Sequence, residues 1–358
     1  MAILVTIITA LAVGLLLFRI KVPGGLMLGA IAGAFMLNIM FDYAYIPAFA
    51  RIITQIISGT VIACSINKED IIKIGQIARP FLILICGMLI VNLIAGFLIF
   101  RISDLDLLTS LMSAVPGGMN DVTIISAEMG GNAPKVALFQ LIRSFTTIAI
   151  FPAMSLKMTG GMKKPLFVPG ETLQPGNDKE LASKSWRKMI TRRNVINLLA
   201  TLSVAACLGI TGRLSGIPAG TLIFSMAGVI ILKFTTGRAY IPLTAKRTAQ
   251  VLAGAYIGSI MTRTELFGMK SIILPAIILV SLYCINCIIT GYILHKKCGF
   301  DRREAMLGAM PAGVSDIALI ANELGVQSAN VVKMHLLRLL SVVTFFPQVM
   351  AFIVFLAP

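Results

Sequence analysis

The first half of the chain carries Val115-Pro-Gly-Gly-Met-Asn-Asp121, and 195 positions later the second half carries Met310-Pro-Ala-Gly-Val-Ser-Asp316. Proline removes a main-chain donor and clashes with the preceding helical turn, while glycine frees the backbone, so each stretch predicts a broken helix. Within lipid a break is tolerated only where protein or a water-filled cavity bonds the freed peptide groups. Two such breaks therefore predict a binding site at the middle of a membrane domain.

The same offset of 195 positions pairs residues far from the two breaks, without a gap. It pairs Pro23 with Pro218, Ala44-Tyr-Ile-Pro47 with Ala239-Tyr-Ile-Pro242, Gln55 with Gln250, and Phe151-Pro152 with Phe346-Pro347. Chance does not keep one register over so many positions, so the sequence indicates a duplication. We predict a first membrane repeat at 1–157, a basic cytoplasmic linker at 158–193 and a second membrane repeat at 194–358.

The composition is that of a polytopic membrane protein. Apolar residues make up 57% of the chain and charged residues 13%, against roughly 25% charged residues in an average soluble domain. A helix needs about 20 apolar residues to cross the hydrocarbon layer, and lipid-facing backbone must be bonded internally, so we predict an all-α fold. The predicted apolar segments are Ala2–Phe18, Leu26–Phe41, Ile46–Ser65, Phe81–Phe100, Pro134–Leu156, Val195–Ile210, Thr221–Phe234, Thr244–Met261, Ile272–Leu294 and Val331–Leu356.

The net charge of +16 has two interpretations. It could indicate a nucleic-acid partner, or it could reflect the excess of Lys and Arg that sets membrane topology. The positive residues concentrate in loops, and the linker at 158–193 is too short for a separate nucleic-acid-binding domain. We therefore expect the lipid bilayer as the partner and no nucleic acid.

The segment from Leu105 to Gly130, which contains the first break, either crosses the membrane or enters it and returns. If it crosses, the two repeats are parallel. If it re-enters, each repeat has about five transmembrane helices plus the broken segment, and the repeats are inverted. The inverted arrangement places Arg19, Lys21, Lys68, Lys73 and Arg79 in the cytoplasm, so the positive-inside rule favours it.

The predicted substrate- or ion-binding residues are those of the two breaks and the polar residues that follow them. A carboxylate in the middle of a membrane costs about 2.5 to 3.5 kcal/mol, so it is expected to bind a coupling proton, a cation or a substrate amine. The alternative is that each aspartate caps the half-helix that it begins. The residues are Pro116, Gly117, Gly118, Asn120, Asp121, Pro311, Ala312, Gly313, Ser315 and Asp316.

Polar residues of neighbouring helices are predicted to balance charge or to line a pathway. In the next helix Gln140 and Arg143, like His335 and Arg338, lie three positions apart and share a face. Such an arginine needs a carboxylate, a carbonyl or an anionic ligand, and we expect an ion pair with an acid of its own repeat. Two further pairs complete the prediction.

Glu128 and Glu323 are either solvated end residues or pathway residues. Gln55 and Gln250 either face the cavity or bond to a neighbouring helix. The two histidines, His295 and His335, do not have the spacing of metal ligands, and the chain carries neither a P-loop nor a nucleophile elbow. We therefore expect no metal, no cofactor and no enzymatic activity.

The paired stretches AVPGGMNDVTIISAEMGGN and AMPAGVSDIALIANELGVQ are each followed by an arginine-bearing helix that ends in Phe-Pro. In these features the chain resembles the internally duplicated AbrB-type membrane proteins, which are also labelled ammonia monooxygenases. The resemblance implies a multi-pass inner-membrane protein related to cation/proton antiporters and bile-acid symporters, and one member has been linked to regulation of gene expression. The oxygenase label would need metal ligands that two distant histidines do not supply.

These observations lead to a functional hypothesis. The chain is expected to be a secondary transporter, coupled to an ion or proton, that carries a small solute by alternating access. The competing hypothesis is a membrane sensor or regulator that binds a ligand, affects gene expression and moves nothing. The sequence leaves the substrate, its charge, the coupling ion and a homo-oligomer open.

Overall fold

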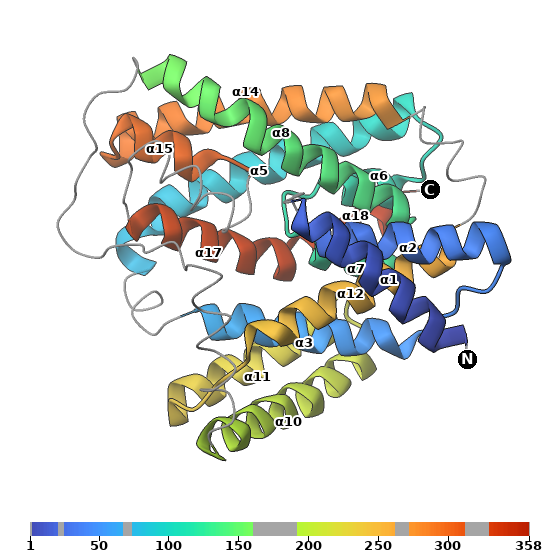
Figure 1. Ribbon diagram of the computed structural model, residues 1–358. Helices are drawn as coiled ribbons and strands as arrows, with labels where there is room; N and C mark the ends of the chain where they lie inside the picture. Colours follow the sequence, from blue (N-terminus) through green and yellow to red (C-terminus); the bar gives the residue numbers. More distant parts are fainter. Residues whose placement is uncertain are drawn as a thin grey trace.

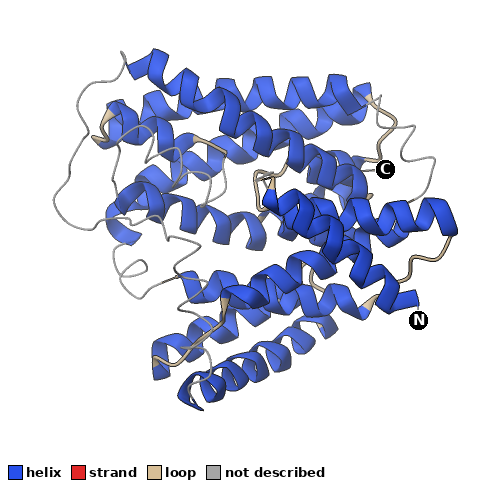
Figure 2. Ribbon diagram, viewed as in Figure 1, coloured by secondary structure: helices blue, strands red, loops and turns tan. Residues whose placement is uncertain are grey.

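The computed structural model describes residues 2–20, 25–66, 74–159, 192–261, 272–311 and 329–357. In these ranges all the regular elements are α-helices, joined by loops and turns (Figures 1 and 2). The helices are α1 (Ala2–Arg19), α2 (Gly25–Phe41), α3 (Phe49–Ser65), α5 (Ile74–Ile102), α6 (Leu107–Ser113), α7 (Met119–Glu128), α8 (Ala133–Thr159), α10 (Arg192–Leu214), α11 (Gly220–Thr236), α12 (Leu243–Ile260), α14 (Ile273–Cys298), α15 (Arg302–Ala309), α17 (Ala329–Thr344) and α18 (Phe346–Leu356).

Five described stretches are long and apolar enough to cross a membrane: Ala2–Arg19, Ala78–Ile102, Asn194–Leu214, Ile273–Cys298 and Asn330–Leu356. Shorter apolar helices, α2, α3 and α11, accompany them. Large apolar side chains on the outer faces are exposed, as on α1 and α14. Water would not favour so much exposed apolar surface, whereas lipid tails accept it. The structure thus contains five of the predicted membrane helices at full length.

The helices form two bundles that each combine both halves of the chain (Figure 1). The first, here called the six-helix bundle, consists of α1, α2, α3, α10, α11 and α12. The second, here called the hairpin bundle, consists of α5, α6, α7, α8, α14, α15, α17 and α18. The bundles meet where α3 and α12 contact α7 and α8. Neighbours in space are therefore often distant in sequence.

Glycines set the close packing inside the six-helix bundle. A Cβ atom on Gly29 of α2 would lie 2.6 Å from Cα of Gly14 on α1. On the other side of α2, a Cβ atom on Gly254 of α12 would collide with the carbonyl oxygen of Met27. Small residues let helix backbones approach, which matters in lipid because packing rather than the hydrophobic effect drives helix association.

Two pairs of positions 195 residues apart make the same hydrogen bond. The amide of Tyr45 donates to Oγ1 of Thr6 over 3.1 Å. The amide of Tyr240 donates to Oγ1 of Thr201, also over 3.1 Å. In both cases a threonine of the first helix of its half binds the loop that leads into the third.

The C-terminal ends of α3 and α12 are bonded by another pair of positions 195 residues apart. Nδ2 of Asn38, on α2, donates to the carbonyl of Met261 over 3.0 Å. Nζ of Lys233, on α11, donates to the carbonyl of Ile66 over 2.6 Å. These bonds stabilise orphan carbonyls at helix ends, and each crosses from one half of the chain to the other.

The same bonds establish the relative direction of α3 and α12. Asn38 joins the C-terminal end of α2 to the C-terminal end of α12. A short loop, 42–48, leads from the end of α2 to the start of α3. Helix α3 therefore begins where α12 ends, and the two helices run in opposite directions.

The first Pro-Gly segment folds back on itself. Helix α6 begins with Asp106, whose carboxylate accepts the amide of Thr109 over 2.9 Å, and α7 ends at Glu128. Beyond α7, the amide of Asn132 donates to Oγ1 of Thr109 over 2.8 Å. The start of α6 and the residues after α7 thus lie together, so α6 and α7 form a hairpin. Its counterpart at 312–328 lies outside the described residues.

The last apolar segment, Asn330–Leu356, has the length that the sequence predicts but contains an interruption. The sequence predicts one span over Val331–Leu356, but the structure divides it at Phe345 into α17 and α18. Pro347 lies in the first turn of α18, where its fixed φ angle suits a new helix and its missing donor leaves no bond unmade. In the first half α8 continues from Ala133 to Thr159 through the corresponding Phe-Pro pair.

Candidate functional site

The first break separates two short helices. Helix α6 ends at Ser113 and α7 begins at Met119. Gly118 stands at the N-cap of α7 in an extended conformation, φ −70° and ψ 138°, and no side chain caps the helix from that position. Asp121 lies in the first turn of α7, and a Cβ atom on Gly118 would lie 2.8 Å from its Oδ2. The carboxylate therefore folds back along the positive end of the half-helix.

Side chains of α8 bond the carbonyls that the first break leaves open. Nη2 of Arg143 donates to the carbonyl of Gly117 over 2.5 Å, and Nη1 reaches the carbonyl of Val115 over 3.5 Å. Nε2 of Gln140 donates to Val115 over 3.1 Å and to Ser113 over 3.4 Å. Gln140 is fully buried and Arg143 is 5% exposed. The break is thus held by protein donors.

A third donor comes from the other half of the chain. The hydroxyl of Tyr283, on α14, donates to the carbonyl of Ala114. Tyr283 is 1% exposed, and a buried tyrosine hydroxyl is normally hydrogen-bonded. The first break therefore depends on both halves.

Helix α17 holds the end of α15 in a related way. Nη1 of Arg338 donates to the carbonyl of Met310 over 2.6 Å, and Nε2 of His335 lies 2.9 Å from the carbonyl of Leu307. Met310 is the position 195 residues after Val115. In both halves an arginine of the following helix thus bonds the carbonyl that precedes the break proline.

The arginines were expected to pair with acids, and the bonds that the structure describes go to main-chain carbonyls. A guanidinium offers five donors in a rigid fork, so it can bond two carbonyls that point in different directions. A carbonyl at a helix end also carries partial negative charge. These bonds match the carbonyl alternative, and the ion pairs with acids stay a prediction.

One face of α3 follows α7 along its length. Nη1 of Arg51 donates to the carbonyl of Ala127 over 2.9 Å, at the C-terminal end of α7. Nε2 of Gln55 donates to Oε2 of Glu128 over 2.6 Å. One turn further along α3, a serine hydroxyl bonds the carboxylate of Asp121.

The serine is Ser58, three positions after Gln55 and seven after Arg51, which is helical spacing. Gln55 is 1% exposed and Glu128 partly buried. Of the two alternatives for Gln55, the structure has the bond to a neighbouring helix.

Asp121 lines a cavity of about 210 Å³ at the junction of the two bundles. The wall comes from α3 and α12 of the six-helix bundle and from α7 and α17 of the hairpin bundle. The lining residues are Ile57, Ser58, Val61, Ile62, Ser65, Asn120, Asp121, Lys246, Ala249, Leu336 and Leu339.

The cavity wall carries opposite charges from opposite bundles. Asp121 belongs to α7 and Lys246 to α12, and the two interact electrostatically. Both side chains are partly buried. Because charges interact more strongly away from water, the cavity wall attracts ligand groups of either charge sign at these two positions.

The structure distributes the predicted site residues unevenly. Asn120 and Asp121 lie in the cavity wall. Gly117 is buried, and a Cβ atom there would collide with Val122 and lie 3.0 Å from Val342 of α17. Pro116 and Pro311 are buried, and Gln250 is partly exposed on α12. The predicted residues outside the described ranges are Ala312, Gly313, Ser315, Asp316 and Glu323.

Three residues at the site were not predicted from the sequence. Ser58 and Tyr283 are each one of several polar residues in their helices. The signal from Ser58 is weak because a serine often bonds within its own helix. Lys246 was counted only as a topology signal. It is the position 195 residues after Arg51, which contacts the same helix α7, and that correspondence could have identified it.

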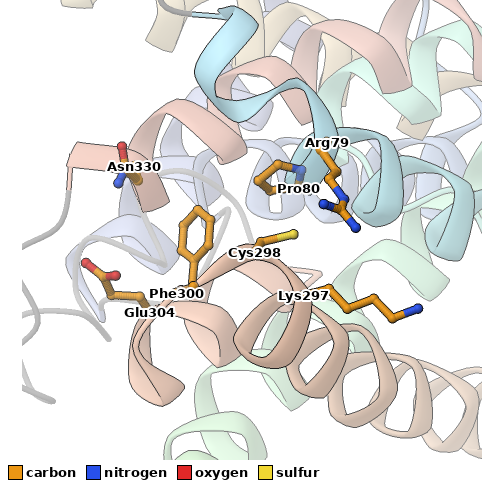
Figure 3. A pocket seen from close by; sticks show the side chains of 8 residues that line it. Arg79, Pro80, Lys297, Cys298, Phe300, Glu304 and Asn330 are labelled. Carbon is orange, nitrogen blue, oxygen red and sulfur yellow. The ribbon is translucent and has the colours of Figure 1, made fainter.

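A second, more open cavity of about 410 Å³ lies where α5, α14, α15 and α17 meet (Figure 3). Its lining includes Arg79 at the start of the apolar part of α5, Lys297 at the end of α14 and Glu304 on α15. Arg79 and Lys297 are exposed. This cavity borders the predicted cytoplasmic loops and lies apart from Asp121.

Comparison with known proteins agrees with the motifs. A family model described as "Transition state regulatory protein AbrB" matches residues 1–159 and, overlapping this range, residues 44–354. The chain belongs to the AbrB family. It is similar to "Putative regulator AbrB" of Escherichia coli (strain K12), 25% identical over 97% of this chain and 94% of that protein. It is also similar to "Uncharacterized protein YhjN" of Bacillus subtilis (strain 168), 25% identical over 72% of this chain and 67% of that one.

Proposed function

We propose that this AbrB-family protein is a secondary transporter, coupled to an ion or a proton, that carries a small solute by alternating access. The observation that carries the proposal is the cavity at Asp121, whose wall is divided between the two bundles. A site at such a junction can open to one side or the other when one bundle moves against its neighbour. The same movement would change the distance between Asp121 and Lys246, because they belong to different bundles.

The proposal includes two repeats in inverted orientation, at 1–157 and 194–358. It is supported by the matched bonds of Thr6 and Thr201 and by the opposite directions of α3 and α12. Inverted repeats give a transporter two related conformations, because the two halves can exchange their arrangements. The pairing of helices across the halves in both bundles is consistent with this.

The proposed location is the inner membrane, with the linker at 158–193 in the cytoplasm. In this orientation the C-terminal end of α3 and the N-terminal end of α12 face the cytoplasm. Ser65 and Lys246 stand at these ends, and both line the cavity. The described conformation would then be nearer to an inward-facing state.

The hairpin of α6 and α7 is held firmly by its own bundle, while the six-helix bundle on the other side of the cavity can move relative to it. Arg143, Gln140 and Tyr283 bond the carbonyls of the break. The half-helix α7 is therefore positioned by the hairpin bundle, while Ser58 and Lys246 approach it from the six-helix bundle. A relative movement of the bundles would exchange the second set of contacts and keep the first.

The test is solute-driven current from purified protein in liposomes, measured with a panel of organic acids, amines, amino acids and ammonium under proton and sodium gradients. We expect a saturable current that the variant Asp121→Asn abolishes. Asp104→Asn, which removes an exposed carboxylate between α5 and α6, serves as the control and should keep the current. A wild-type protein that moves no charge or solute under any gradient contradicts the proposal.

The second candidate is a membrane sensor that binds a ligand without moving it. The names of the family and of the Escherichia coli relative, which refer to regulation, favour it. It predicts saturable ligand binding by the purified protein together with an absence of flux in the same liposomes. Its signal would have to pass through a cytoplasmic segment such as the linker at 158–193.

A further inference from the structure

The cavity at Asp121 contains features that narrow the chemistry of its ligand. Among the described residues, it brings together one carboxylate, one ammonium and a largely apolar wall. Resting on the proposed function, we infer that the ligand is a small monocarboxylic acid or amino acid whose carboxylate binds Lys246. The argument follows from charge, from size and from the identity of the wall residues.

Charge balance favours a ligand with one acidic group. Asp121 and Lys246 sum to zero, so a bare cation would leave an uncompensated positive charge in a partly buried site, which is costly. A zwitterion keeps the balance, with its amine on Asp121 and its carboxylate on Lys246. A simple monocarboxylate keeps it as well if Asp121 takes up a proton.

The form of the acid is restricted by Lys246, the one ammonium in the part of the cavity wall that the structure describes. One lysine matches one negative charge, which favours a carboxylate over a doubly charged phosphate. Asn120 stands in the first turn of α7 and also lines the cavity. The positive end of that half-helix, ten residues long, adds to the attraction for an anionic group.

The volume of the cavity and its apolar wall limit the part of the ligand that is attached to the carboxylate. A cavity of about 150 Å³ holds benzene, so the 210 Å³ found here suits a molecule of about eight non-hydrogen atoms. Ile57, Val61 and Ile62 of α3 form one apolar side, and Leu336 and Leu339 of α17 form another. A short aliphatic or aromatic chain attached to the carboxylate fits these surfaces.

The two kinds of acid are distinguished by Asp121. An amino acid needs the ionised carboxylate as the partner of its amine, so Asp121→Asn should abolish its binding. A simple acid needs a neutral group at that position, so Asp121→Asn should keep its binding. The two outcomes show whether the ligand is an amino acid or a simple acid. In both cases Lys246 binds the carboxylate of the ligand.

The experiment is equilibrium binding to the purified full-length protein in detergent, with butyrate, benzoate, glycine, valine and n-butylamine as probes. We expect at least one of the four acids to bind saturably and n-butylamine not to bind. Lys246→Gln should weaken the binding of that acid by about tenfold or more, because it removes a charged hydrogen bond. Lys246→Arg should weaken binding less than Lys246→Gln does, since it keeps the charge while changing the geometry of the donors.

Lys297→Gln is the matched control, because Lys297 lines the separate cavity at the end of α14 and its loss should leave binding unchanged. The inference is overturned if none of the four acids binds, if n-butylamine binds as tightly as butyrate, or if Lys246→Gln has no effect. Binding is measured without flux, so the two proposals fail separately. An acid that binds but is not transported contradicts the transport proposal alone, whereas current carried by amines alone contradicts this inference.

Discussion

At the ends of both α6 and α15, side chains of the following long helix hydrogen-bond the open main-chain carbonyls, but the residues differ. In the first half Gln140 and Arg143 both reach the carbonyl of Val115. In the second half Arg338 alone of its pair reaches the matching carbonyl of Met310, and His335 reaches Leu307 one turn earlier. In both halves an arginine donates a hydrogen bond to a main-chain carbonyl, whereas the residue three positions before it differs. The ends of α6 and α15 thus share the arginine bond and differ in the second donor.

The largest expected effect comes from the arginine of the better described half. Arg143→Met should lower the free energy of unfolding by about 2 to 4 kcal/mol, because buried carbonyls of the break lose a charged donor. Thermal unfolding of the purified protein in detergent measures it. Arg101→Met, at the exposed end of α5, is the control. Equal stability of the two variants would show that the arginine does not hold the break.

The next effect tests the contribution of the other half to the first break. Tyr283→Phe removes the donor to the carbonyl of Ala114 and should cost about 1 to 2 kcal/mol of stability. Tyr292→Phe in the same helix is the control, since Tyr292 is 56% exposed. Equal unfolding temperatures for the two variants would contradict the role given to Tyr283.

A smaller effect separates the two glutamines of the third helices. Gln55→Leu removes the bond to Glu128 and should cost about 1 kcal/mol. Gln250→Leu, on the partly exposed face of α12, should stay within about 0.5 kcal/mol of the wild type. Unfolding in detergent compares them directly, and a larger loss for Gln250→Leu would reverse the assignment.

The smallest effect exchanges the residues that distinguish the two halves. Gln140→His should cost about 0.5 to 1 kcal/mol, because one ring N–H replaces an amide that donates to Ser113 and Val115. His335→Gln should cost less, since an amide can still donate to Leu307. The unfolding temperatures of the two single variants and of the double exchange give the comparison. A greater loss for His335→Gln would contradict it.

Much of the fold could be predicted because lipid makes strong local demands. Apolar length and the Pro-Gly breaks predicted the membrane helices and the break after Ser113, both of which the structure contains. The position of Asp121 in the first turn after that break follows from helical spacing alone. The division at Phe345 was missed because one apolar run can hold one helix or two, and composition does not distinguish them.

By itself, the sequence determined which residues belong to the broken segments and which polar groups lie within apolar helices, since both depend on neighbours a few positions away. Only the tertiary structure decided that the first segment returns at Asn132. The partners of Arg143 and the meeting of Lys246 with Asp121 were likewise decided by packing. These contacts join helices from distant parts of the chain. Which helices come together depends on the packing of whole bundles, and a local sequence pattern does not contain that information.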